Sequence, residues 1–177
     1  MNVNISLDYF TLFGLPRRFG IDEAALDLAW HVLQAEVHPD RHTHLPDNER
    51  SRMMQEALRV NEAFATLKKP LARAQYLLEL LGVDTGAAAN TTMAPEFLIE
   101  QMEWREAVEE ARIASDVDAL EQLALRLRLH ASEVTATLEE QLDGGGDPGA
   151  AADTVRRLMF LDRLRRETDD ALSALDG

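Results

Sequence analysis

One short segment, VHPDRHTH, contains the side chains of this sequence that are best placed to do chemistry together. It brings His38, Asp40, His42 and His44 close to one another in the chain. Three imidazoles at the spacing H-x3-H-x-H could bind a metal ion, although the segment offers no clear fourth ligand. His38 and Asp40 could form an acid–base dyad, although no nucleophile motif accompanies them. The third possibility is a turn that ends a helix at Pro39.

Two amphipathic helical patterns flank this segment and would position it. Apolar residues recur at helical spacing on both sides, as one buried face of a helix requires. The stripe before the segment consists of Leu26, Ala29, Trp30, Leu33 and Val37, and the stripe after it of Met53, Ala57, Val60, Phe64 and Leu67. Asp22 can cap the first helix, and Pro70 marks the end of the second. The pattern therefore predicts two antiparallel helices with His38, Pro39 and Asp40 in the loop between them.

Composition narrows the classes of function. Hydrophobic residues make up 46% of the 177 residues, which is enough for a packed core, and the dominance of Leu and Ala favours helices. A net charge of −14 argues against a nucleic-acid partner. The absence of cysteine excludes disulfides and thiolate metal sites within this chain. Because we find no leader pattern and no apolar run of membrane-spanning length, we expect a soluble, cytoplasmic protein with no membrane partner.

The first half of the sequence resembles a J-domain, the module with which J-proteins stimulate the ATPase of Hsp70 chaperones. Residues 8–16, DYFTLFGLP, resemble the family opening DYF-LFGLP, and NEAF at 61–64 resembles part of the third J helix. Residues 70–78, PLARAQYLL, resemble the closing segment PL-RA-YLL of HscB, the family of iron–sulfur cluster co-chaperones. The resemblance implies that four loop residues contact the Hsp70: His38, Pro39, Asp40 and Arg41.

One stretch departs from the J-domain pattern. The second helix of J-domains usually presents Lys and Arg to the acidic surface of the Hsp70, whereas residues 22–37 contain neither. The nearby cations are Arg17, Arg18 and Arg41. We therefore expect electrostatic recruitment through this helix to be weaker, or the partner surface to be different.

The second half predicts an antiparallel three-helix bundle. Small and polar residues without a helical stripe indicate a linker at 82–94. Helical patterns then cover residues 95–113, 116–142 and 148–175. Short connections between long amphipathic helices are typical of such a bundle. The predicted fold is therefore all-α, with a J-domain at 1–81, built as an antiparallel helical hairpin with short flanking helices, and the bundle at 95–177.

The first bundle helix carries apolar residues on two faces. One face is the expected core stripe, which consists of Phe97, Trp104, Val108 and Ala111. A second apolar cluster lies roughly 100–200° around the helix from Phe97. Its apolar members are Leu98, Ile99 and Met102. The acidic rim consists of Glu103, Glu106 and Glu110, and Phe160 of the last helix could join the cluster. An apolar cluster with an acidic rim is typical of a protein-binding surface, and a covering helix is the alternative.

The bundle also resembles HscB. Residues 97–106, FLIEQMEWRE, are similar to the family segment FLMEQLELRE, and residues 153–164, DTVRRLMFLDRL, to DTVRKLRFLDKL. In that family the bundle binds IscU, the scaffold protein on which iron–sulfur clusters are built. The resemblance therefore implies that the apolar cluster and its rim contact IscU.

The function implied by both resemblances is that of a co-chaperone without catalytic activity, metal or cofactor of its own. Such a protein delivers IscU to the specialised Hsp70 HscA, stimulates the HscA ATPase and promotes cluster transfer. Two alternatives remain. One is a J-domain co-chaperone for another client, and the other is an enzyme or metalloprotein that uses His38, His42 and His44.

Overall fold

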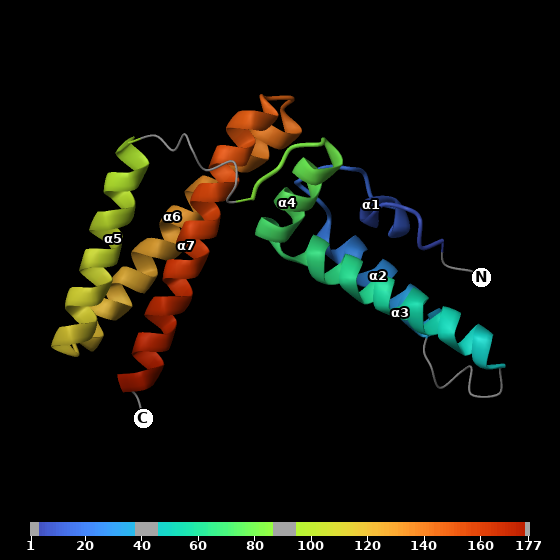
Figure 1. Ribbon diagram of the computed structural model, residues 1–177, viewed down its shortest axis with the longest axis horizontal. Helices are drawn as coiled ribbons and strands as arrows, with labels where there is room; N and C mark the ends of the chain where they lie inside the picture. Colours follow the sequence, from blue (N-terminus) through green and yellow to red (C-terminus); the bar gives the residue numbers. More distant parts are fainter. Residues whose placement is uncertain (1–3, 38–45, 87–94, 176–177) are drawn as a thin grey trace. The chain divides into compact units, whose positions relative to one another are not determined.

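The structure of the protein is a computed structural model, and it describes residues 4–37, 46–86 and 95–175. In these ranges the chain folds into helices joined by turns, which confirms the predicted all-α fold (Figure 1). The helices are α1 (Tyr9–Leu12), α2 (Glu23–Val37), α3 (Asp47–Lys68), α4 (Pro70–Leu80), α5 (Pro95–Ala114), α6 (Val117–Asp143) and α7 (Pro148–Leu175). The chain divides into two compact units, Met1–Leu77 and Leu78–Gly177.

In the first unit, α2 and α3 form an antiparallel pair. The Trp30 ring stacks on Phe64 with 4.6 Å between centroids, and its indole N–H donates a hydrogen bond to Asn61 Oδ1 at 3.2 Å. Lys68, at the end of α3, pairs with Asp27 near the start of α2 at 2.9 Å. The end of one helix therefore lies beside the start of the other, as the sequence predicts. Four residues of the two predicted stripes are at most 1% exposed: Leu26, Val37, Val60 and Leu67.

The short helix α1 depends on the residue that caps it. The Asp8 carboxylate accepts hydrogen bonds from the backbone N–H groups of Phe10 and Thr11, each at 3.1 Å, and pairs with Arg17 at 2.7 Å. Burial raises the pKa of Asp8, but the hydrogen bonds from Arg17 and Thr11 outweigh burial and lower this pKa from 3.8 to about 2. The ionised form of Asp8 therefore stabilises the start of the fold.

Helix α4 packs against α1, and with α1 it is one of the short helices predicted to flank the hairpin, although no bounds were predicted for it. The Tyr76 ring stacks on Tyr9 with 4.3 Å between centroids, and the Tyr76 hydroxyl accepts a hydrogen bond from the Tyr9 backbone N–H at 3.1 Å. Arg73 donates a hydrogen bond to the Leu67 carbonyl at 2.6 Å. Pro70 is the first residue of α4, where the missing N–H of proline costs no helical hydrogen bond. The proline that ends one helical pattern thus also begins the next helix.

The second unit is an antiparallel bundle of α5, α6 and α7. The ends of these helices differ from the predicted patterns by at most one residue. Its core consists of leucine, valine and alanine side chains that are at most 1% exposed, namely Leu120, Ala124, Leu127, Leu138, Ala151, Val155, Leu161 and Leu164. Burial of this apolar area supplies the main driving force for assembling the bundle.

Tight turns connect the bundle helices. Ser115 has a φ of 52° between α5 and α6, and Gly145, between α6 and α7, has a φ of 74°, a conformation that glycine adopts without steric cost. Leu175 has the helical spacing of the α7 core residues Leu161, Leu164 and Ala171, which predicts burial, but its side chain is 38% exposed at the end of the helix. Every helix in the described ranges is too short or too polar to cross a lipid bilayer.

Candidate protein-binding sites

The first candidate site is the tip of the α2–α3 hairpin. The predicted contact residues His38, Pro39, Asp40 and Arg41 lie outside the described residues, so their roles stay a prediction. The metal-binding and acid–base alternatives concern the same undescribed segment. The structure does describe the helix end that leads into the tip, where Val37 is 1% exposed and anchors the end of α2 in the core. Elsewhere in the described ranges, no group of three or more His, Asp or Glu side chains is arranged to hold a metal ion.

The face of α2 that points away from α3 is apolar. Its exposed residues are Ala24, Leu28, His31, Val32 and Ala35. Leu28 is 68% exposed and Val32 54%. The absence of Lys and Arg from this helix thus leaves an exposed apolar stripe. This stripe was not predicted, although Ala24, Leu28 and Val32 recur every four residues, the spacing of one helix face.

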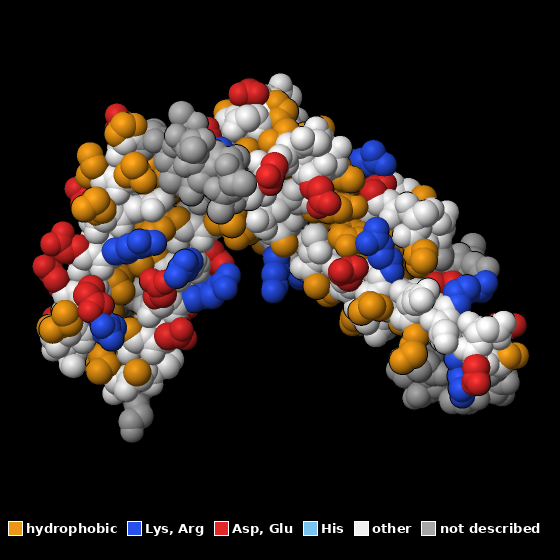
Figure 2. All heavy atoms as spheres, in the orientation of Figure 1, with side chains coloured by type: hydrophobic (Ala, Val, Ile, Leu, Met, Phe, Trp, Pro, Cys, Tyr) orange, Lys and Arg blue, Asp and Glu red, His pale blue; other side chains and the backbone are white. Residues whose placement is uncertain are grey.

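The second candidate site is the outer face of α5, formed by Leu98, Ile99, Met102, Glu103, Glu106 and Glu110. Leu98 is 48%, Ile99 57% and Met102 71% exposed, so neither α6 nor α7 covers them. The three glutamates are exposed as well. Figure 2 shows hydrophobic side chains gathered over the N-terminal half of α5, with acidic side chains farther along the same helix. The predicted apolar cluster and its acidic rim therefore share one exposed face.

Phe160, the remaining predicted contact residue, lies on α7 and is half-buried. Its ring packs edge-on against Phe97 with 5.9 Å between centroids, and the Arg105 guanidinium lies 5.6 Å from its centre. Arg105 follows Leu98 by two helical turns on the same side of α5. The structure therefore places Phe160 between the two helices, beside the outer face rather than on it.

A charged residue lies within the core stripe of α5. Glu100 Oε1 lies 2.8 Å from His130 Nε2 on α6, and Glu100 Oε2 is paired with Arg157 on α7. The Glu100 side chain is 21% exposed and that of His130 is 27% exposed. This contact was not predicted from the sequence. Glu100 follows Phe97 by three residues and precedes Trp104 by four, so its place in an apolar stripe was the available signal.

Trp104 lies one turn of α5 beyond Glu100 and contacts the same histidine. Its ring stacks on His130 with 6.3 Å between centroids, and the Arg126 guanidinium lies 4.8 Å from its centre. Phe97 is held in a similar way, with the Arg157 guanidinium 5.5 Å from its ring centre. The inner side of this half of α5 thus contacts its neighbours through aromatic rings, cations and one carboxylate. Trp104 and Phe97, predicted as core residues, are half-buried.

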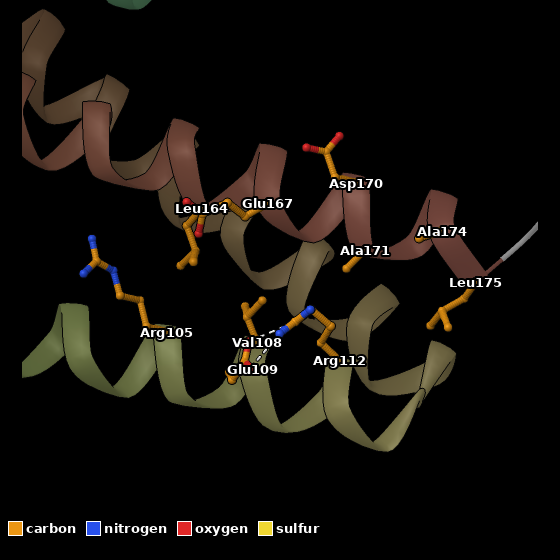
Figure 3. A pocket seen from close by; sticks show the side chains of 10 residues that line it. All are labelled: Arg105, Val108, Glu109, Arg112, Leu164, Glu167, Asp170, Ala171, Ala174 and Leu175. Atoms are coloured by element: carbon orange, nitrogen blue, oxygen red, sulfur yellow. Dashed lines mark hydrogen bonds and ion pairs between the residues drawn. The ribbon is translucent and has the colours of Figure 1, made fainter.

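A cleft of about 630 Å³ lies between the C-terminal parts of α5 and α7 (Figure 3). Val108 and Leu164 point into it. Charged residues line its two walls, with Arg105 and Arg112 on α5 and Glu167 and Asp170 on α7. Arg112 pairs with Glu109 on its own helix at 2.7 Å rather than across the cleft. No residue of the outer face lines this cleft, so the two features are separate.

Comparison with known proteins gives consistent results. The family model described as the HSCB C-terminal oligomerisation domain matches residues 93–169. The "Co-chaperone protein HscB homolog" of Azoarcus sp. (strain BH72) is 65% identical over 177 residues, which is 100% of both chains. Chaperone HscB from Vibrio cholerae has a TM-score of 0.84 and 35% identity, with 96% of this chain and 99% of that chain covered.

The human co-chaperone protein HscB has a TM-score of 0.87 and 26% identity, with 94% of this chain and 82% of that chain covered. These similarities confirm the predicted combination of a J-domain and a helical bundle. Because the Azoarcus relative is 65% identical over the full length of both proteins, the chain belongs to the HscB family of co-chaperones.

Proposed function

We propose that this co-chaperone joins two binding events. Its bundle binds the scaffold protein IscU, and its J-domain delivers the bound IscU to the Hsp70 HscA and stimulates the HscA ATPase. The observation that carries the proposal is the outer face of α5. Leu98, Ile99 and Met102 are 48–71% exposed beside an acidic rim, and a co-chaperone with such a face needs a client to cover it.

The chemistry of the outer face indicates what kind of client surface it binds. Burial of Leu98, Ile99 and Met102 would supply most of the affinity, since apolar area removed from water dominates protein association. The unbranched Met102 side chain can adapt to an irregular partner surface. Glu103, with Glu106 and Glu110 farther along the helix, would favour a client with basic groups around an apolar centre, and would speed its association. IscU, in the proposal, presents such a surface.

The tip residues would act on HscA. Asp40 is suited to accept a charge-assisted hydrogen bond from an arginine of the Hsp70, and Pro39 would fix the turn that presents Asp40. Val37, which is 1% exposed, holds the end of α2 directly before this segment. Stimulation of hydrolysis requires the tip to bind the hydrolysis-competent state of HscA more tightly than the other state. Hydrolysis then locks HscA onto IscU and promotes cluster transfer.

This proposal assigns the J-domain to residues 1–81, the linker to 82–94 and the IscU-binding bundle to 95–177. The protein would work in the cytoplasm, with no cofactor and no catalysis of its own. The alternative is a J-domain co-chaperone for another client. Capture of proteins from a cytosolic extract separates the two, because enrichment of IscU supports the proposal and enrichment of unrelated unfolded chains supports the alternative.

The replacement Asp40→Asn tests the action of the tip. It should abolish stimulation of the HscA ATPase while helical content and IscU affinity stay unchanged, because it removes one charge from a segment far along the chain from the bundle. Asp47→Asn is the matched control, since Asp47 is an exposed aspartate in the first turn of α3 and pairs with Arg50 on its own helix. Full stimulation by the Asp40→Asn protein would refute the assignment of the tip.

A further inference from the structure

We infer that Glu100 is a positioning residue for client binding. Its carboxylate, which is paired with Arg157 of α7 and lies against His130 of α6, fixes the N-terminal half of α5 and thereby the placement of the outer face. The inference rests on the proposed function, because it concerns how the outer face meets IscU. Glu100 itself does not belong to that face, since it lies on the inner stripe with Phe97 and Trp104.

Aliphatic packing holds the N-terminal half of α5 only weakly. The buried residues of α5 are Val108 and Ala111, both in its C-terminal half. In the N-terminal half, residues 95–104, every side chain is half-buried or exposed. Helices α6 and α7, by contrast, bury apolar residues along most of their length. The half of α5 that carries Leu98, Ile99 and Met102 therefore depends on other contacts for its position.

Glu100 supplies contacts to both neighbouring helices at once. One carboxylate oxygen lies 2.8 Å from His130 Nε2 and the other is paired with Arg157. Because Glu100 is only 21% exposed, water screens its pair with Arg157 less than it screens an ion pair on the open surface. The two partners also touch the aromatic residues on either side, since Arg157 lies over Phe97 and His130 stacks on Trp104. Glu100 is thus the centre of a connected cluster.

The residues along the cleft between α5 and α7 show which contacts link the two helices. Along the cleft, charged residues pair within their own helices. Arg112 pairs with Glu109 (Figure 3), and Glu167 pairs with Arg163. These ion pairs therefore do not connect α5 to α7. The link between α5 and α7 toward the N-terminus of α5 includes the Glu100–Arg157 pair and the edge-on contact of Phe97 with Phe160.

The position of Glu100 couples this link to the outer face. Leu98 and Ile99 directly precede it, and Met102 follows it by two residues. A rotation of α5 about its axis would move all three apolar side chains together. Loss of the Glu100 contacts should therefore lower IscU affinity without removing any atom that touches IscU, because part of the binding energy would be spent on ordering the helix.

The test compares Glu100→Gln with Glu109→Gln. Both replace one glutamate of α5 by its neutral isostere, but Glu109 is exposed and pairs only with Arg112 on its own helix in the described contacts. Titration calorimetry with purified IscU should show a dissociation constant about five- to tenfold higher for Glu100→Gln and unchanged for Glu109→Gln. Arg157→Gln should also weaken binding, and the double variant should weaken it by less than the two single effects combined, because each change breaks the same Glu100–Arg157 contact. Arg157→Lys should restore part of the affinity.

Hydrogen exchange provides the readout that separates positioning from general destabilisation. In Glu100→Gln, exchange should rise selectively for the amides of the N-terminal half of α5, while those of α6 and α7 keep their protection. Unchanged IscU affinity would overturn the inference and leave the proposed function intact. Increased exchange throughout the bundle would also overturn it, because Glu100 would then only support the fold. Failure of the unmodified protein to bind IscU would refute the proposed function, and the inference with it.

Discussion

The strongest quantitative prediction concerns the double replacement Leu98→Ala with Met102→Ala on the outer face of α5. Full burial of such a side chain contributes about 1.5–3 kcal/mol. Leu98 is 48% exposed and Met102 is 71% exposed, so these fractions remain to be buried by a client. Scaling by exposure gives about 1 kcal/mol for Leu98 and about 1.5 kcal/mol for Met102. Together, about 2.5 kcal/mol corresponds to a dissociation constant for IscU that is about 70-fold higher.

The fold should tolerate this double replacement. Both side chains are exposed and alanine favours helices, so the free energy of unfolding should change by less than about 0.5 kcal/mol. The matched control is Leu125→Ala with Leu129→Ala on α6. These leucines are also four residues apart and are 55% and 59% exposed, but they lie outside the outer face. The control should leave IscU affinity unchanged.

Titration calorimetry at several temperatures measures both the affinity and the heat-capacity change of binding. Loss of apolar contact area should make the heat-capacity change less negative in the Leu98→Ala, Met102→Ala protein. The prediction fails if this protein binds IscU as tightly as the unmodified protein does. It also fails if the α6 control weakens binding equally, because the affinity would then not depend on the outer face of α5.

Two further predictions concern the stability of the J-domain. The pKa of Asp8 is about 2 in the folded protein and 3.8 for an unperturbed aspartate, so ionised Asp8 stabilises the fold above about pH 4, and this contribution is lost as the pH falls toward 2. Because Arg17 is 62% exposed and solvent screens the pair, we expect a loss of about 1 kcal/mol, which urea denaturation between pH 5 and pH 2.5 should show for the unmodified protein and much less for Asp8→Asn. Trp30→Ala removes the stacking on Phe64 and the hydrogen bond to Asn61, and urea denaturation should show a loss of about 2–4 kcal/mol. A loss below about 0.5 kcal/mol would mean that this contact does not hold α2 against α3.

Much of the fold follows from local signals in the sequence. The apolar stripes predicted which faces of α2 and α3 are buried, and Leu26, Val37, Val60 and Leu67 are in the core. Asp22 was predicted to cap α2, and its carboxylate accepts a hydrogen bond from the Ala25 backbone N–H at 3.0 Å. These features depend on spacing and on side chains within a few residues, so the sequence contains the information needed to predict them.

Other features depend on which helix lies opposite. The exposure of Leu98, Ile99 and Met102 required knowledge that α6 and α7 pack on the other side of α5, because the sequence alone fits a covered cluster equally well. Glu100 was overlooked for the same reason, since its partners His130 and Arg157 lie far away in the chain. Leu175 has the spacing of a core residue, but its exposure at the end of α7 is decided by the tertiary packing.

The central claim is that the protein brings its client and HscA together, and the ATPase activity of HscA tests it most directly. The activity should be measured with HscA alone, with this protein, with IscU, and with both. We expect this protein to raise the ATPase rate, and the combination with IscU to raise it by more than the sum of the two separate effects. The same rate with and without this protein, in the presence of IscU, would contradict the claim.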